Sequence, residues 1–204
     1  MMADLAATEK LFFERAGMDR GRVTEIVKDA VKGADDGELF LEYRLAESLT
    51  FDDGHLRNAS FDASQGFGLR AVSGELTGLA HASELSEAAI KRAAETVKSA
   101  RSGRGGTLAL PPQGTNRSLY TGDNPLEAVD MAAKVKLLAE IDAYARGLDR
   151  RVSQVMASLA GSWQAVRIIR PDGTEVGDIR PLVRLSVQVV ERIIKNSSDS
   201  SSSS

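Results

Sequence analysis

Residues 38–82 carry alternating apolar and polar side chains interrupted by turn signals, and this pattern constrains the fold more than any other. The first alternating segment places its apolar residues on one face, at Leu39, Leu41, Tyr43 and Leu45. That alternation is typical of a half-buried strand. Asp53-Gly54 and Ser73-Gly74 both tolerate the positive φ angles of tight hairpin turns. We therefore expect an antiparallel meander, with further strands at 56–61, 67–72 and 76–81.

Helical periodicity lies on both sides of this meander. A first one-sided helix is predicted to end at 34–37, and its apolar residues are Val23, Ile26, Val27, Ala30 and Val31. Ser83 is expected to cap a second helix, whose apolar stripe is Ile90, Ala93, Ala94 and Val97. Asn124 and Pro125 are expected to start a third helix of about six turns, which ends at Gly147. Its predicted apolar face is Leu126, Val129, Ala133, Leu137, Ile141, Tyr144 and Leu148.

Strand patterns return after the third helix, at 152–160, 163–170 and 182–190. The turn Pro171-Asp172-Gly173 is expected to join the last two of these regions. Both groups of strands are connected by hairpins, and helices precede each group. The predicted fold class is α+β, with mixed, mainly antiparallel sheets in which hairpin meanders pack against helices.

A single domain is expected over residues 1–190, with a Gly- and Pro-rich break at 102–124 that opposes regular structure. Residues 191–204 form a serine-rich, low-complexity tail that cannot build a packed core and is expected to be disordered. The tail follows a predicted strand whose apolar face needs a partner, formed by Val183, Leu185, Val187 and Val189. An end so soon after this strand suggests a truncated chain.

Composition restricts the partners. The 204-residue chain has 26 basic and 29 acidic residues and a formal net charge of −3, so the positive surface that nucleic-acid binding needs is not expected. The absence of cysteine excludes disulfides, thiolate metal sites and cysteine nucleophiles within this chain. Residues 1–17 lack the features of a secretory signal, and no stretch is long enough to span a bilayer. We expect a cytoplasmic protein with no membrane partner.

Four glycines, Gly66, Gly68, Gly74 and Gly78, lie close together near His81, which raises the question of a phosphate cradle with a catalytic base. A dinucleotide fingerprint needs its glycines between a strand and a helix. Gly66 and Gly68 instead lie inside a strand pattern, and the third glycine of the fingerprint is missing at the required spacing. Glycines within strands mark bulges or a close approach of backbone, and this is the interpretation that we adopt.

The remaining polar candidates do not form a catalytic set. His55 follows a turn and His81 ends a strand, and neither has a partner at the spacing of a metal-binding helix. His81 is therefore interpreted as a polar strand end rather than a general base. Three groups of carboxylates, Asp35-Asp36, Asp52-Asp53 and Asp62, lie beside turn residues, where Asp hydrogen-bonds to local backbone. We assign no catalytic, metal-binding or substrate-binding residue from the sequence.

An RNA-binding element is not supported by the sequence, and the roles of two aromatic residues stay open. Arg104 lies in a Gly-Arg-Gly-Gly stretch that resembles an RNA-binding element, but one copy without aromatic neighbours favours a flexible linker. Phe67 and Trp163 are candidates for core anchors, and either could instead be a contact residue on the surface.

Three stretches resemble a known family: residues 49–97, 124–146 and 152–190. The most specific strings within them are SQGFGLR at 64–70 and SLAGSWQAVRIIR at 158–170. They resemble the N-terminal half of TldD-type chains of the TldD/PmbA family, also labelled modulator of DNA gyrase. The similarity runs from about residue 38 to residue 190, which is most of the chain, and departs from the family near Arg192.

The resemblance implies a cytoplasmic zinc metallopeptidase that acts on peptides as a heterodimer with a PmbA/TldE-type partner. In that family a His-Glu-x-x-x-His helix in the second half of the chain holds the metal, and the bound zinc activates water for attack on the peptide carbonyl. None of these residues is present here, so no cofactor is expected in this chain and the chain is expected to be inactive alone. Whether it is an enzyme is left open.

Two functions follow as alternatives. The first is an N-terminal domain or truncated form of a TldD-like metallopeptidase, which contributes scaffold, a wall of the substrate chamber and part of the partner interface. Extended peptides would bind there along an open strand edge through main-chain hydrogen bonds, and the glycines at 66–78 would allow close backbone approach. The second is a catalytically inactive, stand-alone binding or assembly module.

Overall fold

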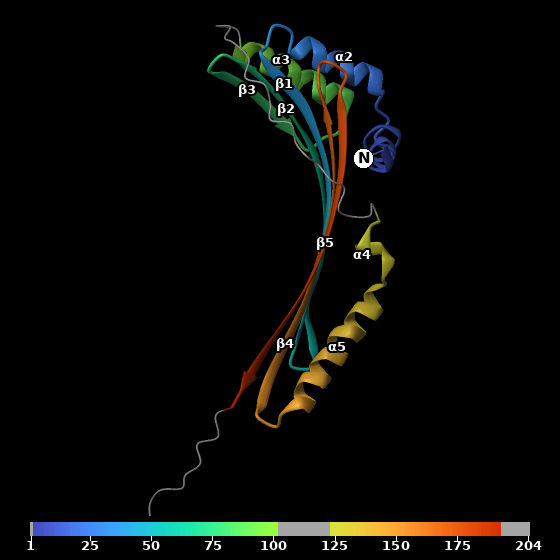
Figure 1. Ribbon diagram of the computed structural model, residues 1–204, viewed down its shortest axis with the longest axis vertical. Helices are drawn as coiled ribbons and strands as arrows, with labels where there is room; N and C mark the ends of the chain where they lie inside the picture. Colours follow the sequence, from blue (N-terminus) through green and yellow to red (C-terminus); the bar gives the residue numbers. More distant parts are fainter. Residues whose placement is uncertain (1, 102–122, 193–204) are drawn as a thin grey trace, which may run out of the picture. The chain divides into compact units, whose positions relative to one another are not determined.

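The computed structural model describes residues 2–101 and 123–192 of the chain (Figure 1). Its helical elements in chain order are α1 (Met2–Glu9), the π-helical segment η1 (Lys10–Glu14), α2 (Arg20–Ala30), α3 (Glu87–Arg101), α4 (Pro125–Ala128) and α5 (Met131–Leu148). Its strands are β1 (Asp36–Asp52), β2 (His55–Ser73), β3 (Leu76–Ala82), β4 (Val152–Ile169) and β5 (Glu175–Glu191). The strands form one five-stranded antiparallel sheet in the order β3-β2-β1-β4-β5. The predicted α+β class is confirmed.

The described chain divides into two compact units. Unit 1 comprises Met1–Ala46, Asp62–Asn124 and Ser162–Leu182, and unit 2 comprises Glu47–Phe61, Pro125–Gly161 and Val183–Ser204. Four of the five strands, all but β3, contribute residues to both units. Among residues 2–101 and 123–192, none of the helices has the length and hydropathy of a membrane span.

The hairpin turns are the best-predicted part of the fold. Asp53 and Gly54 both have positive φ angles, of 51° and 78°, which is the combination that a two-residue type I′ turn requires. Gly74 has a φ of 60°, whereas Ser73 is already the last residue of β2, so the second turn consists of Gly74 and Glu75. Each turn joins strands that are neighbours in the sheet.

Two of the predicted strand breaks are wrong. The separate strands expected at 56–61 and 67–72 are parts of one strand, β2, which runs from His55 to Ser73. The strands expected at 152–160 and 163–170 are likewise parts of β4. Ladder hydrogen bonds need only backbone groups, so β4 continues through Gly161 without a break.

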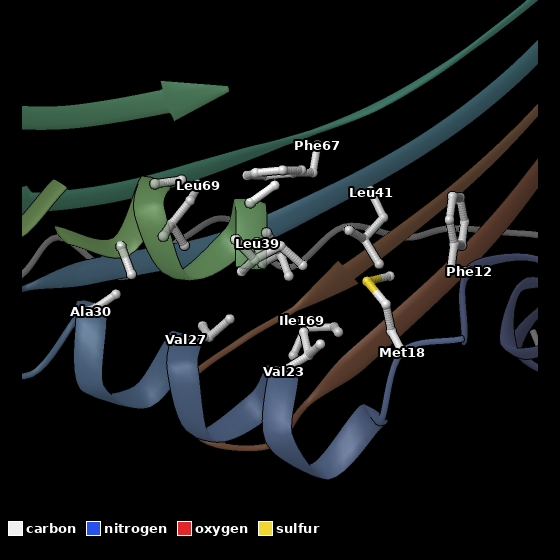
Figure 2. Close-up of a cluster of buried hydrophobic side chains, with 14 of the residues drawn as sticks. Phe12, Met18, Val23, Val27, Ala30, Leu39, Leu41, Phe67, Leu69 and Ile169 are labelled. Atoms are coloured by element: carbon white, nitrogen blue, oxygen red, sulfur yellow. The ribbon is translucent and has the colours of Figure 1, made fainter. Parts of the chain in front are cut away.

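The core of unit 1 lies between the helices α2 and α3 and one face of the sheet. Val23, Val27 and Ala30 of α2 point toward Leu39, Leu69 and Ile169 of the strands (Figure 2). On α3 the predicted apolar stripe is buried in the same cluster, at Ile90, Ala93, Ala94 and Val97. Gly78 allows β3 to approach α3 closely, because a Cβ at this position would lie 2.9 Å from the carbonyl oxygen of Val97. The sequence predicted this face of both helices correctly.

The predicted cap of α3 is wrong. The hydroxyl of Ser86, not that of Ser83, accepts a hydrogen bond from the backbone N–H of Ala89 at 3.1 Å. Glu84 lies before the helix, where its carboxylate accepts hydrogen bonds from the hydroxyl of Ser86 and the guanidinium of Arg92. The sequence offers two serines before this helix, and only the second stands three residues before an unpaired N–H of the first turn.

In unit 2 the single helix expected from Asn124 to Gly147 is two helices. α4 ends at Ala128, and Asp130 caps α5 by accepting a hydrogen bond from the N–H of Ala133 at 2.7 Å. The predicted apolar face holds for Leu126 of α4 and in part for Ile141, but it is wrong for most of α5, whose buried residues are Lys134, Leu138, Asp142 and Ala145. Much of the predicted face is exposed instead, including Val129, Leu137, Tyr144 and Leu148.

Ion pairs explain how α5 buries polar residues. The ammonium group of Lys134 lies 2.8 Å from a carboxylate oxygen of Glu47 and 2.8 Å from the carbonyl oxygen of Leu126. Farther along α5, Arg146 pairs with Asp142 and also with Asp53 in the β1–β2 turn. The apolar core beside these pairs is small and consists of Leu49, Phe51, Leu138 and Ala157. The rotation of α5 is therefore fixed by charge pairing as well as by apolar contacts.

The N-terminal elements α1 and η1, which we did not predict from the sequence, belong to unit 1. Arg167 of β4 is almost fully buried and donates hydrogen bonds to the carbonyl oxygen of Leu5 at 2.9 Å and to the hydroxyl of Thr8 at 3.2 Å. Its guanidinium also pairs with Glu9 at 2.8 Å and with Glu175 of β5. One charged side chain thus holds α1 against the β4–β5 hairpin.

Two expectations fall mainly outside the described residues. The Gly- and Pro-rich break at 102–124, with Arg104, is described only at its last two residues. Of the serine-rich tail at 191–204, only Glu191, which ends β5, and Arg192 are described.

Candidate functional site

The edge of β2 is open beyond the end of β3. The two strands pair from Ser73↔Leu76 to Phe67↔Ala82, and β3 ends at Ala82. β2 continues in the other direction along the chain, and β1 is its neighbour on the other side. In unit 1, residues 62–66 of β2 therefore have no strand beside them on this edge within the described chain. This stretch of the edge can take an added strand, although the backbone of Ala82 and Ser83 lies close to Gly66 at its end.

A hollow of about 400 Å³ lies where β3 leaves β2. Its walls include Phe40 and Glu42 of β1 and His81 of β3, and Gly66 and Gly68 of β2 line it between them. Because side chains alternate along a strand, Phe40 and Glu42 lie on the face opposite the buried core residues of β1. The hollow is therefore on the sheet face that α2 and α3 do not cover.

The two glycines of the hollow are there for different reasons. A Cβ on Gly66 would lie 2.7 Å from the carbonyl oxygen of Ala82, which is closer than packed atoms approach. A Cβ on Gly68 would meet no atom within 4 Å, and Gly68 does not have a positive φ. Close approach of backbone thus confirms our interpretation of Gly66. Neither packing nor backbone geometry requires Gly68, and its missing side chain leaves the hollow open.

Glu42 is the carboxylate of the hollow and is half-buried. Its Oε1 atom accepts a hydrogen bond from the side-chain amide of Gln164 on β4. His81, on the opposite wall, is exposed and pairs in register with Gly68. The hollow therefore combines one oriented acid, one imidazole and the exposed part of an aromatic ring at Phe40.

The structure separates the other candidates named from the sequence. His55 is exposed at the start of β2, in unit 2, whereas His81 belongs to unit 1. Asp35 accepts a hydrogen bond from the N–H of Gly74 at 2.6 Å, as expected for an Asp beside a turn. Asp36 instead forms an ion pair with Arg70 at 2.7 Å.

The carboxylates near the β1–β2 turn are also engaged structurally. Asp52 accepts a hydrogen bond from the side-chain amide of Gln154 at 2.9 Å, and Asp53 pairs with Arg146. Asp62 does not lie beside a turn, as we had expected, but is exposed within β2.

The two aromatic candidates differ. Phe67 is 4% exposed and belongs to the core of unit 1. Trp163 is partly buried against that core and contacts Tyr43 edge-to-face, with ring centroids 6.3 Å apart. Both aromatic rings therefore contribute to the core of unit 1.

Metal-binding groups do not converge in the described chain. Within residues 2–101 and 123–192, no three His, Asp or Glu side chains are grouped to hold a metal ion. The chain has no cysteine and only two histidines, both exposed, whereas protein zinc sites use closely grouped Cys, His and carboxylate ligands. The donor set described here does not fit a zinc centre.

Family models match both parts of the chain. Residues 37–101 match PmbA/TldA metallopeptidase domain 1, and residues 124–203 match the PmbA/TldA metallopeptidase central domain. The chain belongs to the PmbA/TldD family. The resemblance seen in the sequence is thereby confirmed.

Curated relatives of this chain agree with the family assignment. The chain is 38% identical over 163 residues to the metalloprotease TldD homolog of Haemophilus influenzae, a match that covers 78% of this chain and 34% of the relative. It is 34% identical over 157 residues to the TldD homolog of Buchnera aphidicola subsp. Schizaphis graminum, which covers 76% of this chain and 32% of the relative. The chain spans about a third of the length of these relatives.

Solved structures share the fold. The TldE structure from Thermococcus kodakarensis has a TM-score of 0.65 and 17% identity, over 84% of this chain and 40% of that one. A proposed modulator of DNA gyrase from Bacteroides thetaiotaomicron has a TM-score of 0.67 and 16% identity, over 85% of this chain and 41% of that one. At these identities the likeness concerns the fold alone.

Sequence reasoning missed Glu42 and Gln164 as parts of the site. Alternation along β1 did place Glu42 on the face opposite the core, but nothing local indicates that Gln164, 122 residues later, binds it. The neighbourhood of β1 and β4 depends on sheet order, which hairpin signals do not determine. The sequence likewise did not indicate that Phe40 lines the hollow.

Proposed function

We propose that the chain acts as the N-terminal part of a TldD-like metallopeptidase and supplies its scaffold, a wall of the substrate chamber and part of the partner interface. The open edge of β2 beside the hollow at Gly68 carries this proposal. The metallopeptidase family models that match residues 37–101 and 124–203 support the reaction class. The whole enzyme acts in proteolysis or peptide maturation in the cytoplasm.

The β2 edge holds an extended peptide by main-chain hydrogen bonds. An added strand beside residues 62–66 continues the line of β3 and pairs with the part of the β2 edge that β3 does not cover. Such binding depends little on peptide sequence, since every residue except proline offers the same N–H and C=O groups. The absence of a side chain at Gly68 makes room beside that strand.

The partner interface is proposed to include unit 2. Its helix α5 exposes Leu137, Tyr144 and Leu148, and its part of β5 exposes Val183 and Leu185. Large exposed apolar side chains of this kind support a protein contact here. The solved structure of a TldE with this fold supports a PmbA/TldE-type subunit as the partner in a heterodimer.

Zinc is proposed for the full-length enzyme and not for this chain. The two exposed histidines and the lack of cysteine leave the described residues without a fitting donor set. We expect the metal to be held elsewhere in the enzyme, and the chain to be inactive alone. Purified chain analysed for metal by mass spectrometry should hold less than one zinc per chain, and stoichiometric zinc would contradict this division of roles.

The peptide-binding role is tested by Gly68→Val in the chain assembled with its partner. The added side chain enters the hollow and should weaken binding of an extended peptide, while the urea unfolding midpoint should not fall, because a Cβ at Gly68 meets no atom within 4 Å. Ala63→Val is the matched control, because Ala63 is exposed on the other face of β2 by alternation. If Gly68→Val binds the extended peptide as tightly as the native chain does, this part of the chain does not form a wall of the substrate chamber.

The alternative is a stand-alone binding or assembly module that keeps the fold without the chemistry. The exposed apolar residues of α5 and β5 favour contact with another protein in this case too. Reading the DNA downstream of the serine-rich tail separates the two functions. A continuing frame with a His-Glu-x-x-x-His sequence supports the metallopeptidase, and a stop codon supports the module.

A further inference from the structure

The hollow beside the open edge of β2 has a chemical preference that the proposed function does not specify. We propose that it takes the cationic end of a lysine or arginine side chain from a peptide bound along β2. This inference rests on the proposed function, because the peptide must first lie along residues 62–66. It adds a specificity-determining residue, Glu42.

Charge is the first argument. Among the residues that line the hollow, Glu42 carries the only carboxylate, and no Lys or Arg lines it. Other acids on the same face of β1 are already paired, since Asp36 and Glu38 both contact Arg70. Glu42 forms its hydrogen bond with a neutral amide, that of Gln164. Glu42 therefore gives the hollow a carboxylate that forms no ion pair within the described chain, although Arg44 lies on the same face two residues along β1.

Orientation is the second argument. The amide of Gln164 binds Oε1 of Glu42 and holds the carboxylate in place before any ligand arrives. A fixed acceptor loses less side-chain entropy on binding than a mobile one. Hydrogen bonds between a cation and a carboxylate are also stronger than those between neutral groups. A half-buried, held carboxylate is thus well suited to an ammonium or guanidinium group.

Shape is the third argument. Gly68 has no side chain, and no atom lies within 4 Å of where its Cβ would be, which leaves a trough between β1 and β3. At Gly66 the corresponding space is taken by the backbone of Ala82 and Ser83. The aliphatic stem of a lysine or arginine can lie over the glycine backbone and against the ring of Phe40. A cation near an aromatic ring gains a further attraction. The volume of about 400 Å³ admits one long side chain.

The test compares three acetylated, amidated pentapeptides, Val-Thr-Xaa-Thr-Val, in which Xaa is lysine, norleucine or glutamate. Each is titrated into the ¹⁵N-labelled 204-residue chain and followed by the amide signals of Gly66, Gly68 and His81. The lysine peptide should bind about tenfold more tightly than the norleucine peptide, as a charge-assisted hydrogen bond predicts, and the glutamate peptide should bind most weakly. The preference should shrink as salt is raised.

Glu42→Gln is the deciding variant, because it removes the charge and keeps an oxygen that can accept from Gln164. It should bind the lysine and norleucine peptides equally. Glu38→Gln is the matched control: it removes one negative charge from the same face of β1, but Glu38 contacts Arg70 and lies outside the hollow. It should keep the lysine preference. Equal urea midpoints would show that neither variant changes the fold.

The outcomes separate this inference from the proposed function. If the native chain binds lysine and norleucine peptides equally, or if the preference survives Glu42→Gln, the cation pocket is wrong and the open edge stands. If none of the three peptides shifts the signals of Gly66, Gly68 or His81, both the pocket and the peptide-binding edge are wrong.

Discussion

The Nζ atom of Lys134 lies 2.8 Å from Oε1 of Glu47, and both side chains are 7% exposed. This buried pair joins α5 to β1 within unit 2, on the helix face where the sequence suggested no contact. Removing one partner leaves the other charge buried without compensation, which is more costly than losing the pair as a whole. The pair therefore allows a sharp test of how α5 is held.

Lys134→Met should lower the free energy of unfolding by about 3–5 kcal/mol, because Glu47 then keeps a buried, unpaired carboxylate. Urea denaturation followed by circular dichroism measures this loss. The double variant Lys134→Met/Glu47→Leu should recover most of it, since two apolar side chains replace the pair. A single variant as stable as the native chain would mean that α5 does not bury this charge.

Gly66 and Gly68 should respond oppositely to alanine. Gly66→Ala places a Cβ 2.7 Å from the carbonyl oxygen of Ala82 and should cost about 1–3 kcal/mol through overpacking. Gly68→Ala meets no atom within 4 Å and should be neutral or add up to about 1 kcal/mol, because glycine weakens a strand interior. Thermal unfolding of both variants gives the comparison. Equal losses would contradict the close approach at Gly66.

Ser86 and Ser83 test the start of α3. Ser86→Ala removes the acceptor for the N–H of Ala89 and should cost about 0.5–2 kcal/mol, the usual range for a lost N-cap. Ser83→Ala removes no cap and should change the unfolding free energy by less than about 0.5 kcal/mol. Chemical denaturation of the two variants side by side decides the point. A larger loss for Ser83→Ala would restore the cap that the sequence suggested.

Asp149, which follows α5, should make stability depend on pH in acid. Its hydrogen bond from the side chain of Arg151, with a second from the Arg151 backbone, lowers the pKa of Asp149 from 3.8 to about 2. A lowered carboxyl pKa favours the folded state above the unfolded pKa, and the benefit is lost as pH falls from about 4 to 2. Asp149→Asn should therefore flatten the pH dependence of the unfolding midpoint in that window. An unaltered slope would rule out this contribution.

Arg167 should control the attachment of α1. Arg167→Met removes the hydrogen bonds to Leu5 and Thr8 and leaves the carboxylate of Glu175 without its main partner. We expect faster hydrogen exchange in α1 and a loss of about 3 kcal/mol or more in unfolding free energy. Hydrogen exchange read by mass spectrometry measures the local loosening of α1, and urea denaturation measures the loss of unfolding free energy. Unchanged protection of α1 would show that apolar contacts alone hold it.

How far the sequence predicted the fold depended on the range of each signal. Asp53-Gly54 gave the correct turn because positive φ is a local requirement that few residue types meet. The face of α5 was wrong because periodicity assigns apolar residues to the inside, and Lys134 is inside through its pairing with Glu47, 87 residues away. No pattern within α5 carries that information.

The candidate site was predicted only in outline. Gly66 was interpreted correctly as a place of close backbone approach, and the open strand edge was expected in kind. Glu42 was not predicted because its role depends on Gln164, which lies 122 residues later in the sequence, and on the unfilled space beside Gly68. An empty space leaves no residue in the sequence to mark it.

The attachment of α1 through Arg167 has a consequence for biosynthesis. Arg167 is translated 162 positions after Leu5, whose carbonyl oxygen it binds. A ribosome-bound chain halted between these two residues would carry α1 without the guanidinium group that holds it against the sheet. The docking of α1 through Arg167 therefore has to wait for β4 to leave the exit tunnel.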